Sequence, residues 1–278
     1  MKKPLIISAI LFLAIALVLT GCSSNNGSTN QEETAKQEKI TIKVGATPVP
    51  HTEILEQVKP ILAKQGIHME IVEFTDYVQP NVALADGNLD YNFFQHEPYL
   101  EEFAQEHQLD IVGGVKVHLE PMGLYSNKIS SLDKLEKGAE IAIPNDVTNG
   151  GRALLLLEKN GLIELDKDAG VEATENDITS NPKNLKFIPL EAAQLPRSIN
   201  DVDAAVINTN YALEGDLNPL KDAIIIEDKD SPYANLIAMR KEEEDSEVTK
   251  AFEKALTSDE IKEFIKTTYK GAIIPAFE

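Results

Sequence analysis

The sequence predicts an α/β protein made of two lobes that are joined by two crossover strands. Short β-rich runs alternate with helical patterns after about residue 40, and this alternation is typical of α/β proteins with mostly parallel sheets. The chain has 278 residues, and the roughly 240 that follow this point are enough for two medium-sized domains. Segments 118–128 and 227–236 each place turn residues beside an apolar strand, with the separation expected of two crossovers.

These two segments divide the folded part of the chain. In the arrangement that they predict, residues 40–120 and 232–278 form lobe 1. Residues 121–231 form lobe 2, which is inserted between the two parts of lobe 1. The division is a hypothesis about topology, because it depends on turn residues and strand spacing alone.

The N-terminus has the layout of a secretory signal peptide. Two lysines precede an apolar run at 5–19, which contains one polar residue, Ser8, and is shorter than the roughly 20 apolar residues of a permanent transmembrane helix. Residues 19–22, Leu-Thr-Gly-Cys, fit a bacterial lipobox, and Cys22 is the only cysteine of the chain. We therefore expect removal of residues 1–21 and attachment of diacylglycerol and palmitate to Cys22. The alternative is a free thiol at the end of an ordinary signal.

Residues 22–39 follow as the lipidated cysteine and a flexible tether. The stretch after Cys22 contains no large apolar side chain, so it buries too little surface to offset the entropy of ordering. Acyl chains would hold the protein at the extracytoplasmic face of the cell membrane. The formal net charge of −20 argues against nucleic-acid binding and against electrostatic docking on anionic lipid.

Eight short runs are predicted to be strands, because they are apolar or β-branched and are bounded by turn residues. They run from Ile40 to Ala46, Met69 to Phe74, Leu89 to Phe93, Glu140 to Ile143, Leu185 to Ile188, Ala204 to Ile207, Ala223 to Ile226 and Leu236 to Met239. Between the first two, apolar residues from Ile54 to Leu62 share one helical face, with Gly66 as C-cap and a kink expected at Pro60. Further helices are predicted to begin near Pro80 and Pro98, and to run through 152–159 and 248–269.

The first cluster of candidate binding residues is Tyr-Asn-Phe-Phe-Gln-His-Glu-Pro-Tyr at 91–99. It lies where a strand should end and a helix begin, and ligands bind at the carboxyl ends of strands in open α/β sheets. The cluster predicts a pocket wall. The alternative is that the aromatic residues belong to the core. Since adjacent residues of a strand face opposite sides, at most one of Phe93 and Phe94 can point into a pocket.

The second cluster extends from Ile143 to Leu157 and includes Gly150, Gly151 and Arg152. A strand ends, polar residues offer N-caps, two glycines would let a ligand approach the backbone, and the arginine follows in the first turn of an apolar helix. This combination predicts an anion site, because free N–H groups and a guanidinium both attract a carboxylate. A surface arginine is the alternative, and phosphate is disfavoured because no Walker pattern follows.

The third segment, 203–212, again ends a short apolar strand in polar residues. Asn208 could orient a ligand by accepting from an ammonium and donating to a carboxylate. The alternative is that the sequence Asn-Thr-Asn caps the next helix.

Three strings in this order, NFFQHEPYL, IPNDVTNGGRALLLLEKNGLI and DAAVINTNYA, closely resemble the MetQ/NlpA family of lipoproteins, the methionine-binding components of ABC importers. The resemblance covers about residues 40–278 and the lipobox. It implies a two-lobed periplasmic-binding-protein-like fold that closes on a free amino acid. It also implies a cognate permease and ATPase as partners, a monomeric protein and no cofactor.

The resemblance also implies roles for particular residues. An aromatic pocket for the thioether would be lined by Tyr77, Phe93, His96 and Tyr99. Arg152 would hold the carboxylate of L-methionine. The amino and carboxyl groups would be held by Asn149, Asn208 and Asn235. A methionine-containing dipeptide, a formylated or oxidised methionine, or another apolar amino acid such as leucine would suit the same fold.

Two other classes of protein remain as alternatives. One is a metal-binding component of a metal importer, with His51, His96, His118 and acidic groups as ligands. Their spacing forms no metal-binding motif, so no metal is predicted. The other is a secreted enzyme, which is disfavoured because the chain has no G-x-S-x-G and no H-E-x-x-H motif, and its single cysteine lies in the lipobox. No catalytic residue is therefore predicted.

Overall fold

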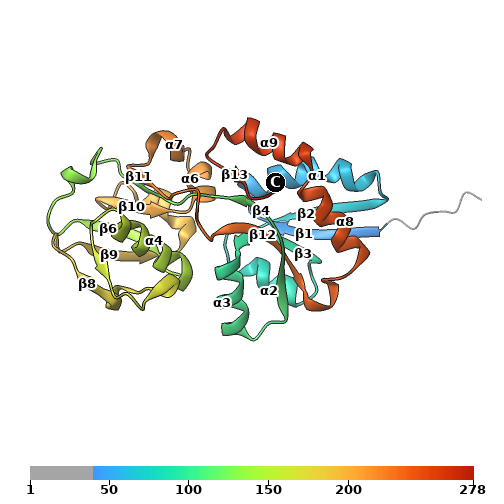
Figure 1. The fold of residues 1–278 in the computed structure, drawn as a ribbon, viewed down its shortest axis with the longest axis horizontal. Helices are drawn as coiled ribbons and strands as arrows, with labels where there is room; N and C mark the ends of the chain where they lie inside the picture. Colours follow the sequence, from blue (N-terminus) through green and yellow to red (C-terminus); the bar gives the residue numbers. More distant parts are fainter. Residues whose placement is uncertain (1–39) are drawn as a thin grey trace, which may run out of the picture. The chain divides into compact units, whose positions relative to one another are not determined.

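Residues 40–278 are described by a computed structural model, and they contain two β-sheets flanked by helices (Figure 1). The predicted signal peptide, Cys22 and the predicted tether lie outside the described residues. We call the part of the chain built on the six-stranded sheet lobe 1, and the part built on the five-stranded sheet lobe 2. Both lobes combine strands with helices, which confirms the predicted α/β class.

The sheet of lobe 1 is parallel on one side and antiparallel on the other. Its strands are β1 (Ile40–Ala46), β2 (Ile67–Glu73), β3 (Tyr91–His96), β4 (Ile111–Leu119), β12 (Ala234–Arg240) and β13 (Ile274–Pro275), in the order β13-β4-β12-β3-β1-β2. β1 pairs in parallel with β2 and β3. β12 pairs antiparallel with β3 and β4, and β13 pairs antiparallel with β4.

The sheet of lobe 2 has the same mixed character. Its strands are β5 (Gly123–Tyr125), β6 (Glu140–Pro144), β9 (Lys186–Leu190), β10 (Ala204–Ile207) and β11 (Ile225–Ile226), in the order β11-β5-β10-β6-β9. β6 pairs in parallel with β9 and β10, whereas β5 pairs antiparallel with β10 and β11. A separate antiparallel pair consists of β7 (Glu164–Leu165) and β8 (Ile178–Ser180).

Two connections join the lobes. The chain leaves β4 after Leu119 and enters β5 at Gly123, and it leaves β11 after Ile226 and enters β12 at Ala234. The predicted lobe boundaries stay predictions, and both lie within these connections. The strands next to the connections run antiparallel to their neighbours, so the prediction of mostly parallel sheets is wrong.

Helices flank both sheets. Lobe 1 carries α1 (Glu53–Ala63), α2 (Gln79–Ala85), α3 (Glu97–His107), α8 (Glu247–Leu256) and α9 (Asp259–Tyr269), with the short turns η1 (Pro48–Thr52) and η6 (Lys241–Glu243). Lobe 2 carries α4 (Val147–Lys159), α5 (Leu195–Ser198), α6 (Thr209–Glu214) and α7 (Pro219–Asp222), with η2 (Leu132–Lys134), η3 (Gly170–Glu172), η4 (Glu175–Asp177) and η5 (Ala192–Gln194).

The helix boundaries follow from capping chemistry. Pro80 and Pro98 lie in the first turns of α2 and α3, as the sequence predicts. The single helix predicted at 248–269 is wrong, because α8 ends at Leu256 and α9 begins at Asp259. The reason is Ser258, whose hydroxyl accepts the N–H of Ile261 and caps a new helix.

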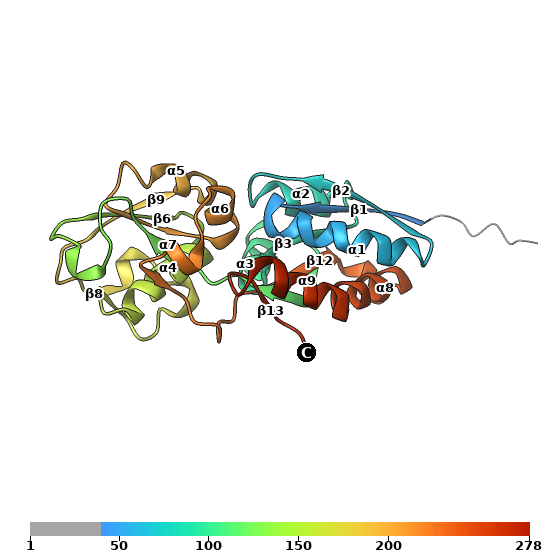
Figure 2. The same cartoon turned by 90° about the horizontal axis from the view of Figure 1, so that it is seen from above.

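The core of lobe 1 has two layers, one on each face of the sheet. α1, α8 and α9 pack together on one face, where Leu55, Phe252 and Ile265 are buried against β1, β3 and β12 (Figure 2). α2 and α3 pack on the other face through Leu84 and Leu100. β3 is consequently buried along its whole length, and its last residues reach the boundary with lobe 2.

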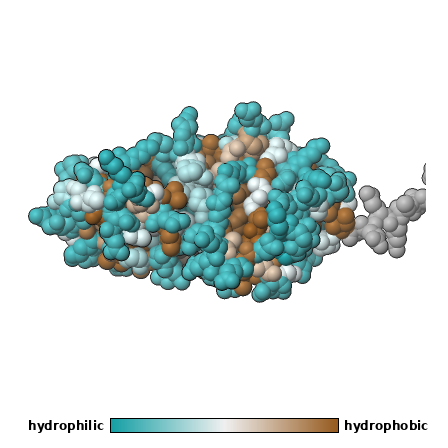
Figure 3. Space-filling model, turned by 60° about the horizontal axis from the view of Figure 1, so that its bottom comes forward, coloured by the Kyte–Doolittle hydropathy of each residue, from teal (hydrophilic) through white to brown (hydrophobic). Residues whose placement is uncertain are grey.

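The face of the molecule shown in Figure 3 is mainly hydrophilic. Hydrophobic residues lie in separate patches between polar ones on the face shown in Figure 3. The large exposed hydrophobic residues are Ile40, Val72, Val78, Val147, Val171 and Leu220. Within residues 40–278, no helix has the length and apolar character needed to cross a membrane.

Candidate ligand-binding site

A cavity with an empty volume of about 320 Å³ is lined by residues of both lobes. Lobe 1 contributes Tyr77, Phe94, Gln95, His96, Tyr99 and Asn235. Lobe 2 contributes Asn149, Arg152, Asn208, Thr209 and Asn210. Glu120, from the connection between β4 and β5, completes the wall.

The structure brings together all the sequence-predicted binding residues except one. Those that line the cavity are Tyr77, His96, Tyr99, Asn149, Arg152, Asn208 and Asn235. Phe93 does not line it and is 0% exposed, with its ring centroid 4.8 Å from that of His51 and 5.3 Å from that of His118. Its neighbour Phe94 lines the cavity instead, because successive side chains of β3 point to opposite faces.

Three aromatic rings form one end of the cavity. The ring centroids of Tyr77, Phe94 and Tyr99 lie 5.8–6.0 Å from one another. The hydroxyl of Tyr99 donates to the backbone oxygen of Tyr77 at 2.9 Å. Burial raises the pKa of both tyrosines, so the hydroxyls stay protonated and act as donors. This end offers apolar surface and ring edges.

His96 links the aromatic end to the polar end. It caps α3, and its Nδ1 accepts the N–H of Tyr99 at 3.2 Å. The proton is therefore on Nε2, which donates to Oδ1 of Asn149 at 3.1 Å. Burial and the nearby charge of Arg152 lower the pKa of His96 to about 3, so the ring is neutral at pH 7.

Arg152 is the cation of the polar end. It is 2% exposed, and its Nε and Nη2 donate to the two carboxylate oxygens of Glu227 at 2.9 and 2.5 Å. Its Cζ lies 4.3 Å from the ring centroid of Tyr233, and Nη2 also donates to the backbone oxygen of Glu120 at 2.8 Å. Nη1 makes no hydrogen bond with any described residue. A buried, fixed guanidinium with one free nitrogen is suited to bind a carboxylate.

Some of the side-chain amide atoms at the polar end already have hydrogen-bond partners, and others have none. Oδ1 of Asn149 accepts from His96 and from Nδ2 of Asn208, the latter at 2.8 Å. Oδ1 of Asn208 and Nδ2 of Asn210 are buried and have no partner among residues 40–278. Oδ1 of Asn235 lies 3.0 Å from Nε2 of His51. Because a buried polar atom without a partner is costly, the free acceptor and the free donor indicate that a polar ligand binds at this end of the cavity.

The glycines before Arg152 do not form an open loop. α4 begins at Val147, with Asp146 as N-cap, so Gly150 and Gly151 lie inside the helix. A Cβ added at Gly151 would lie 2.3 Å from the backbone oxygen of Val171. The predictions of glycines exposed to a ligand and of an arginine in the first turn are therefore wrong. Gly151 allows η3 to pack closely on α4, and Arg152 lies in the second turn.

Hydrogen bonds across the boundary hold the lobes together. Tyr77 donates from its hydroxyl to Oδ1 of Asn210 at 2.6 Å, and its ring centroid is 5.0 Å from that of Tyr211. Tyr211 donates to the backbone oxygen of Thr75 at 3.2 Å. The bond from His96 to Asn149 also joins the lobes. The cavity is thus closed by contacts that must break when the lobes separate.

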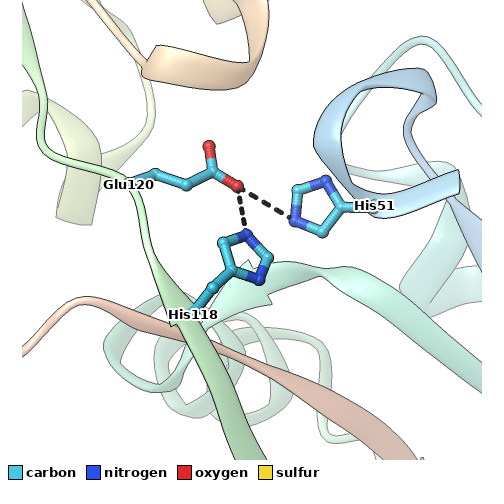
Figure 4. Close-up of side chains that lie close together, drawn as sticks. All are labelled: His51, His118 and Glu120. Atoms are coloured by element: carbon cyan, nitrogen blue, oxygen red, sulfur yellow. Dashed lines mark hydrogen bonds and ion pairs between the residues drawn. The ribbon is translucent and has the colours of Figure 1, made fainter. Parts of the chain in front are cut away.

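His51, His118 and Glu120 form a buried cluster beside the cavity (Figure 4). Oε1 of Glu120 lies 2.7 Å from Nε2 of His118 and 3.2 Å from Nε2 of His51. Imidazole and carboxylate groups can bind Zn²⁺. The two distances are those of hydrogen bonds, however, and Nδ1 of His118 has no partner among residues 40–278, whereas a metal-bound imidazole usually donates through its second nitrogen. His96 is not part of this cluster.

Residues 42–277 match the NlpA lipoprotein family. The chain belongs to this family. The NlpA-family chain is 44% identical to the methionine-binding lipoprotein MetQ of Bacillus subtilis, with 99% of this chain and 100% of that protein covered. It is also similar to solved structures. One is a nutrient-binding protein of Burkholderia cenocepacia bound to methionine, with 48% identity, a TM-score of 0.83, and 85% of this chain and 100% of that chain covered.

A second solved structure similar to this NlpA-family chain is a periplasmic substrate-binding protein of an ABC transporter from Coxiella burnetii. The identity is 45% and the TM-score 0.81, with 84% of this chain and 100% of that chain covered. These likenesses confirm the predicted two-lobed fold of the periplasmic-binding-protein type.

The structure of this NlpA-family chain also adds residues that sequence reasoning missed. Phe94 and Gln95 both line the cavity because the pairing of β3 with β12 is irregular at Phe94, and no local pattern in the sequence indicates that irregularity. Asn210 and Thr209 lie within the third polar segment, where the sequence drew attention to Asn208 alone. Glu120 carried one signal: it follows His118 by two residues, and such residues share a face of an extended chain.

Proposed function

We propose that the chain is a lipid-anchored substrate-binding protein that captures methionine outside the cytoplasm and delivers it to an ABC importer. The observation that carries this proposal is the two-ended cavity between the lobes. One end consists of aromatic rings and the other of a guanidinium and amides. A free amino acid with an apolar tail has the same division into an apolar part and a zwitterion.

The aromatic end suits an unbranched thioether. Sulfur in contact with aromatic ring edges contributes about 0.3–1.5 kcal/mol per contact beyond the burial of area. Tyr77, Phe94 and Tyr99 present such edges within one small volume. Leucine would fill the same volume without a sulfur, so we expect it to bind more weakly by about 1–3 kcal/mol.

The polar end suits the two charged groups of an amino acid. Nη1 of Arg152 and Nδ2 of Asn210 are donors without partners among residues 40–278, and they fit a carboxylate. Oδ1 of Asn208 is an unpartnered acceptor, and it fits an ammonium. Asn149 and Asn235 would support this arrangement, since Asn149 fixes His96 of the wall and Asn235 fixes His51 beside the cavity.

The proposal includes an anchor and partners. Lipidation of Cys22 would hold the protein at the extracytoplasmic face of the cell membrane. Methionine bound between closed lobes would be released when the lobes separate on a cognate permease with its ATPase. The protein would act as a monomer, because the cavity is complete within one chain.

Isothermal titration tests the proposal. Both sheets and their cores lie within residues 40–278, so a chain that begins at Ser23 retains the whole binding unit. After unfolding and refolding to remove bound ligand, it is titrated with L-methionine, D-methionine, L-leucine and methionine dipeptides. Tight binding of a methionine enantiomer supports the proposal. Folded protein that binds a dipeptide or leucine more tightly, or that binds none of these, contradicts it.

A further inference from the structure

Among the described residues that line the cavity between the lobes, Glu120 is the only one with a carboxylate, and no lysine or arginine side chain forms an ion pair with it. It is 5% exposed, and its Oε2 accepts the N–H of Asn210 at 3.0 Å. Arg152 touches only its backbone oxygen, since the guanidinium pairs with Glu227. His51 and His118 would supply positive charge only if they were doubly protonated. Their hydrogen bonds indicate whether they are.

The hydrogen bonds of His51 place its proton on Nε2. This nitrogen faces two oxygen acceptors, Oδ1 of Asn235 at 3.0 Å and Oε1 of Glu120 at 3.2 Å. Nδ1 lies 2.7 Å from the hydroxyl of Thr47, which can donate to it. A neutral ring therefore satisfies every contact, and burial lowers the pKa of His51 to about 4.

His118 is neutral for a similar reason. Nε2 lies 2.7 Å from Oε1 of Glu120 and donates to it. Nδ1 is buried without a partner among residues 40–278, so a second proton there would have no acceptor. Burial lowers the pKa of His118 to about 3. Both rings thus orient the carboxylate of Glu120 without neutralising it.

The cavity consequently has two separated charges on its wall. The guanidinium of Arg152 has a free nitrogen, and the carboxylate of Glu120 lacks a contacting cation. Burial raises the pKa of Glu120, which means that its charged form is costly until a cation arrives. The α-ammonium of an amino acid bound with its carboxylate at Arg152 would supply that cation, and Oδ1 of Asn208 would accept a second ammonium proton.

We propose that Glu120, oriented by His51 and His118, accepts the α-ammonium of the ligand and restricts the site to ligands with a free amino group. This inference rests on the proposed amino-acid ligand and narrows its class. Free methionine meets this requirement for an α-ammonium, and so does a ligand that is modified only at the side chain or the carboxylate. N-formylated and N-acylated methionine do not fit, because they lack the positive charge.

The first arm of the test uses the wild-type chain and two analogues. γ-Methylthiobutyrate keeps the thioether and carboxylate of methionine but lacks the amino group. Methioninamide keeps the amino group but lacks the carboxylate. A hydrogen bond to a charged group corresponds to about a 10- to 150-fold change in affinity, so γ-methylthiobutyrate should bind at least 10-fold more weakly than methionine. Binding within threefold of methionine would overturn the proposal without any variant.

The second arm compares Glu120→Gln with Glu227→Gln. We expect Glu120→Gln to weaken methionine and methioninamide by about 10- to 150-fold, and γ-methylthiobutyrate by less than threefold. Glu227→Gln loosens Arg152 and should weaken methionine and γ-methylthiobutyrate by a similar factor. It keeps the preference for an amino group, which makes it the matched control. Thermal unfolding establishes that each variant is folded.

The outcomes separate this inference from the proposed function. Wild-type protein that binds no methionine contradicts the proposed function and with it the inference. Wild-type protein that binds methionine, with all three ligands weakened equally by Glu120→Gln, contradicts the inference alone. Each titration is repeated with EDTA. An affinity for methionine that changes more than threefold on chelation would show that the cluster of His51, His118 and Glu120 holds a metal, which also overturns the proposal.

Discussion

The two lobes contribute different chemistry to one cavity. Lobe 1 supplies all the aromatic rings of the wall, and lobe 2 supplies the guanidinium and three of the asparagines. Each lobe alone would present an incomplete half, because neither an apolar groove nor a set of amides binds a small zwitterion tightly. Binding of the apolar tail and binding of the charged groups therefore depend on different lobes, so each can be disrupted without the other.

The largest effect is expected from the lobe 2 side. Arg152→Met keeps side-chain length but removes the charge-assisted bonds, each of which contributes about 1.5–3 kcal/mol. We expect the affinity for methionine to fall by about 10³-fold, measured by isothermal titration. The variant also leaves Glu227 without its buried partner, so the free energy of unfolding should fall by about 3 kcal/mol in urea titration.

A double variant separates these two losses. Arg152→Met with Glu227→Leu removes the unpaired carboxylate, so stability should return to within about 1 kcal/mol of the wild type. Affinity should not return, since no cation is restored. Recovery of affinity in the double variant would mean that Arg152 acts only through stability and does not bind the ligand.

The part of the site that depends on local sequence pattern could be predicted. The ends of β3, β6 and β10 are each followed by polar residues, and these ends do meet at the cavity. The alternation of side chains also predicts that only one of two adjacent phenylalanines faces a ligand. Local pattern and strand geometry were enough for this part.

Other features depend on contacts between distant parts of the chain. β3 is buried on both faces, so no polar alternation in the sequence indicates whether Phe93 or Phe94 meets the cavity. Arg152 and Glu227 are 75 residues apart, and their pairing depends on how α4 packs beside the segment that follows β11. Gly151 was misinterpreted because its neighbour Val171 is distant in sequence. Such pairings require the fold itself.

A second prediction concerns the neutral histidines on the lobe 1 side. The pKa of His96 is lowered from 6.5 to about 3, so between these values the unfolded chain binds a proton that the folded chain does not. Its stabilising contribution is complete above about pH 6.5 and is lost as the pH falls towards 3. Between pH 7 and pH 5 the free energy of unfolding should fall by about 2 kcal/mol on account of this residue.

His96→Gln tests that assignment. Glutamine cannot be protonated, so the slope of unfolding free energy against pH between 5 and 6.5 should decrease by about 1 kcal/mol per pH unit. Urea titrations at several pH values measure the slope. His51 and His118 remain in the variant, and their lowered pKa values still make the free energy of unfolding fall as the pH falls. The raised pKa of Glu120 has the opposite effect on the free energy of unfolding at lower pH. An unchanged slope would show that His96 is not the group responsible.

A third prediction uses the neighbouring phenylalanines as a matched pair. Phe94→Leu removes a ring that lines the cavity, so the affinity for methionine should fall by about 2- to 10-fold through the lost sulfur–ring contact. Phe93→Leu changes a buried ring that packs on His51 and His118 but does not line the cavity, and it should lower the free energy of unfolding by about 1 kcal/mol while affinity stays within about twofold. The reverse pattern in titration and urea unfolding would place Phe93, not Phe94, against the ligand.

The smallest expected effect concerns closure of the lobes. Tyr211→Phe removes the hydroxyl that donates to the backbone oxygen of Thr75, a bond made only when the lobes meet. Since a neutral hydrogen bond contributes about 0.5–1.5 kcal/mol, methionine should dissociate about threefold faster in stopped-flow measurements. Tyr233→Phe is the matched control, because its buried hydroxyl has no partner among residues 40–278 and its loss should leave dissociation unchanged. Equal acceleration in both variants would show that burial of a tyrosine, rather than the bond between the lobes, sets the rate.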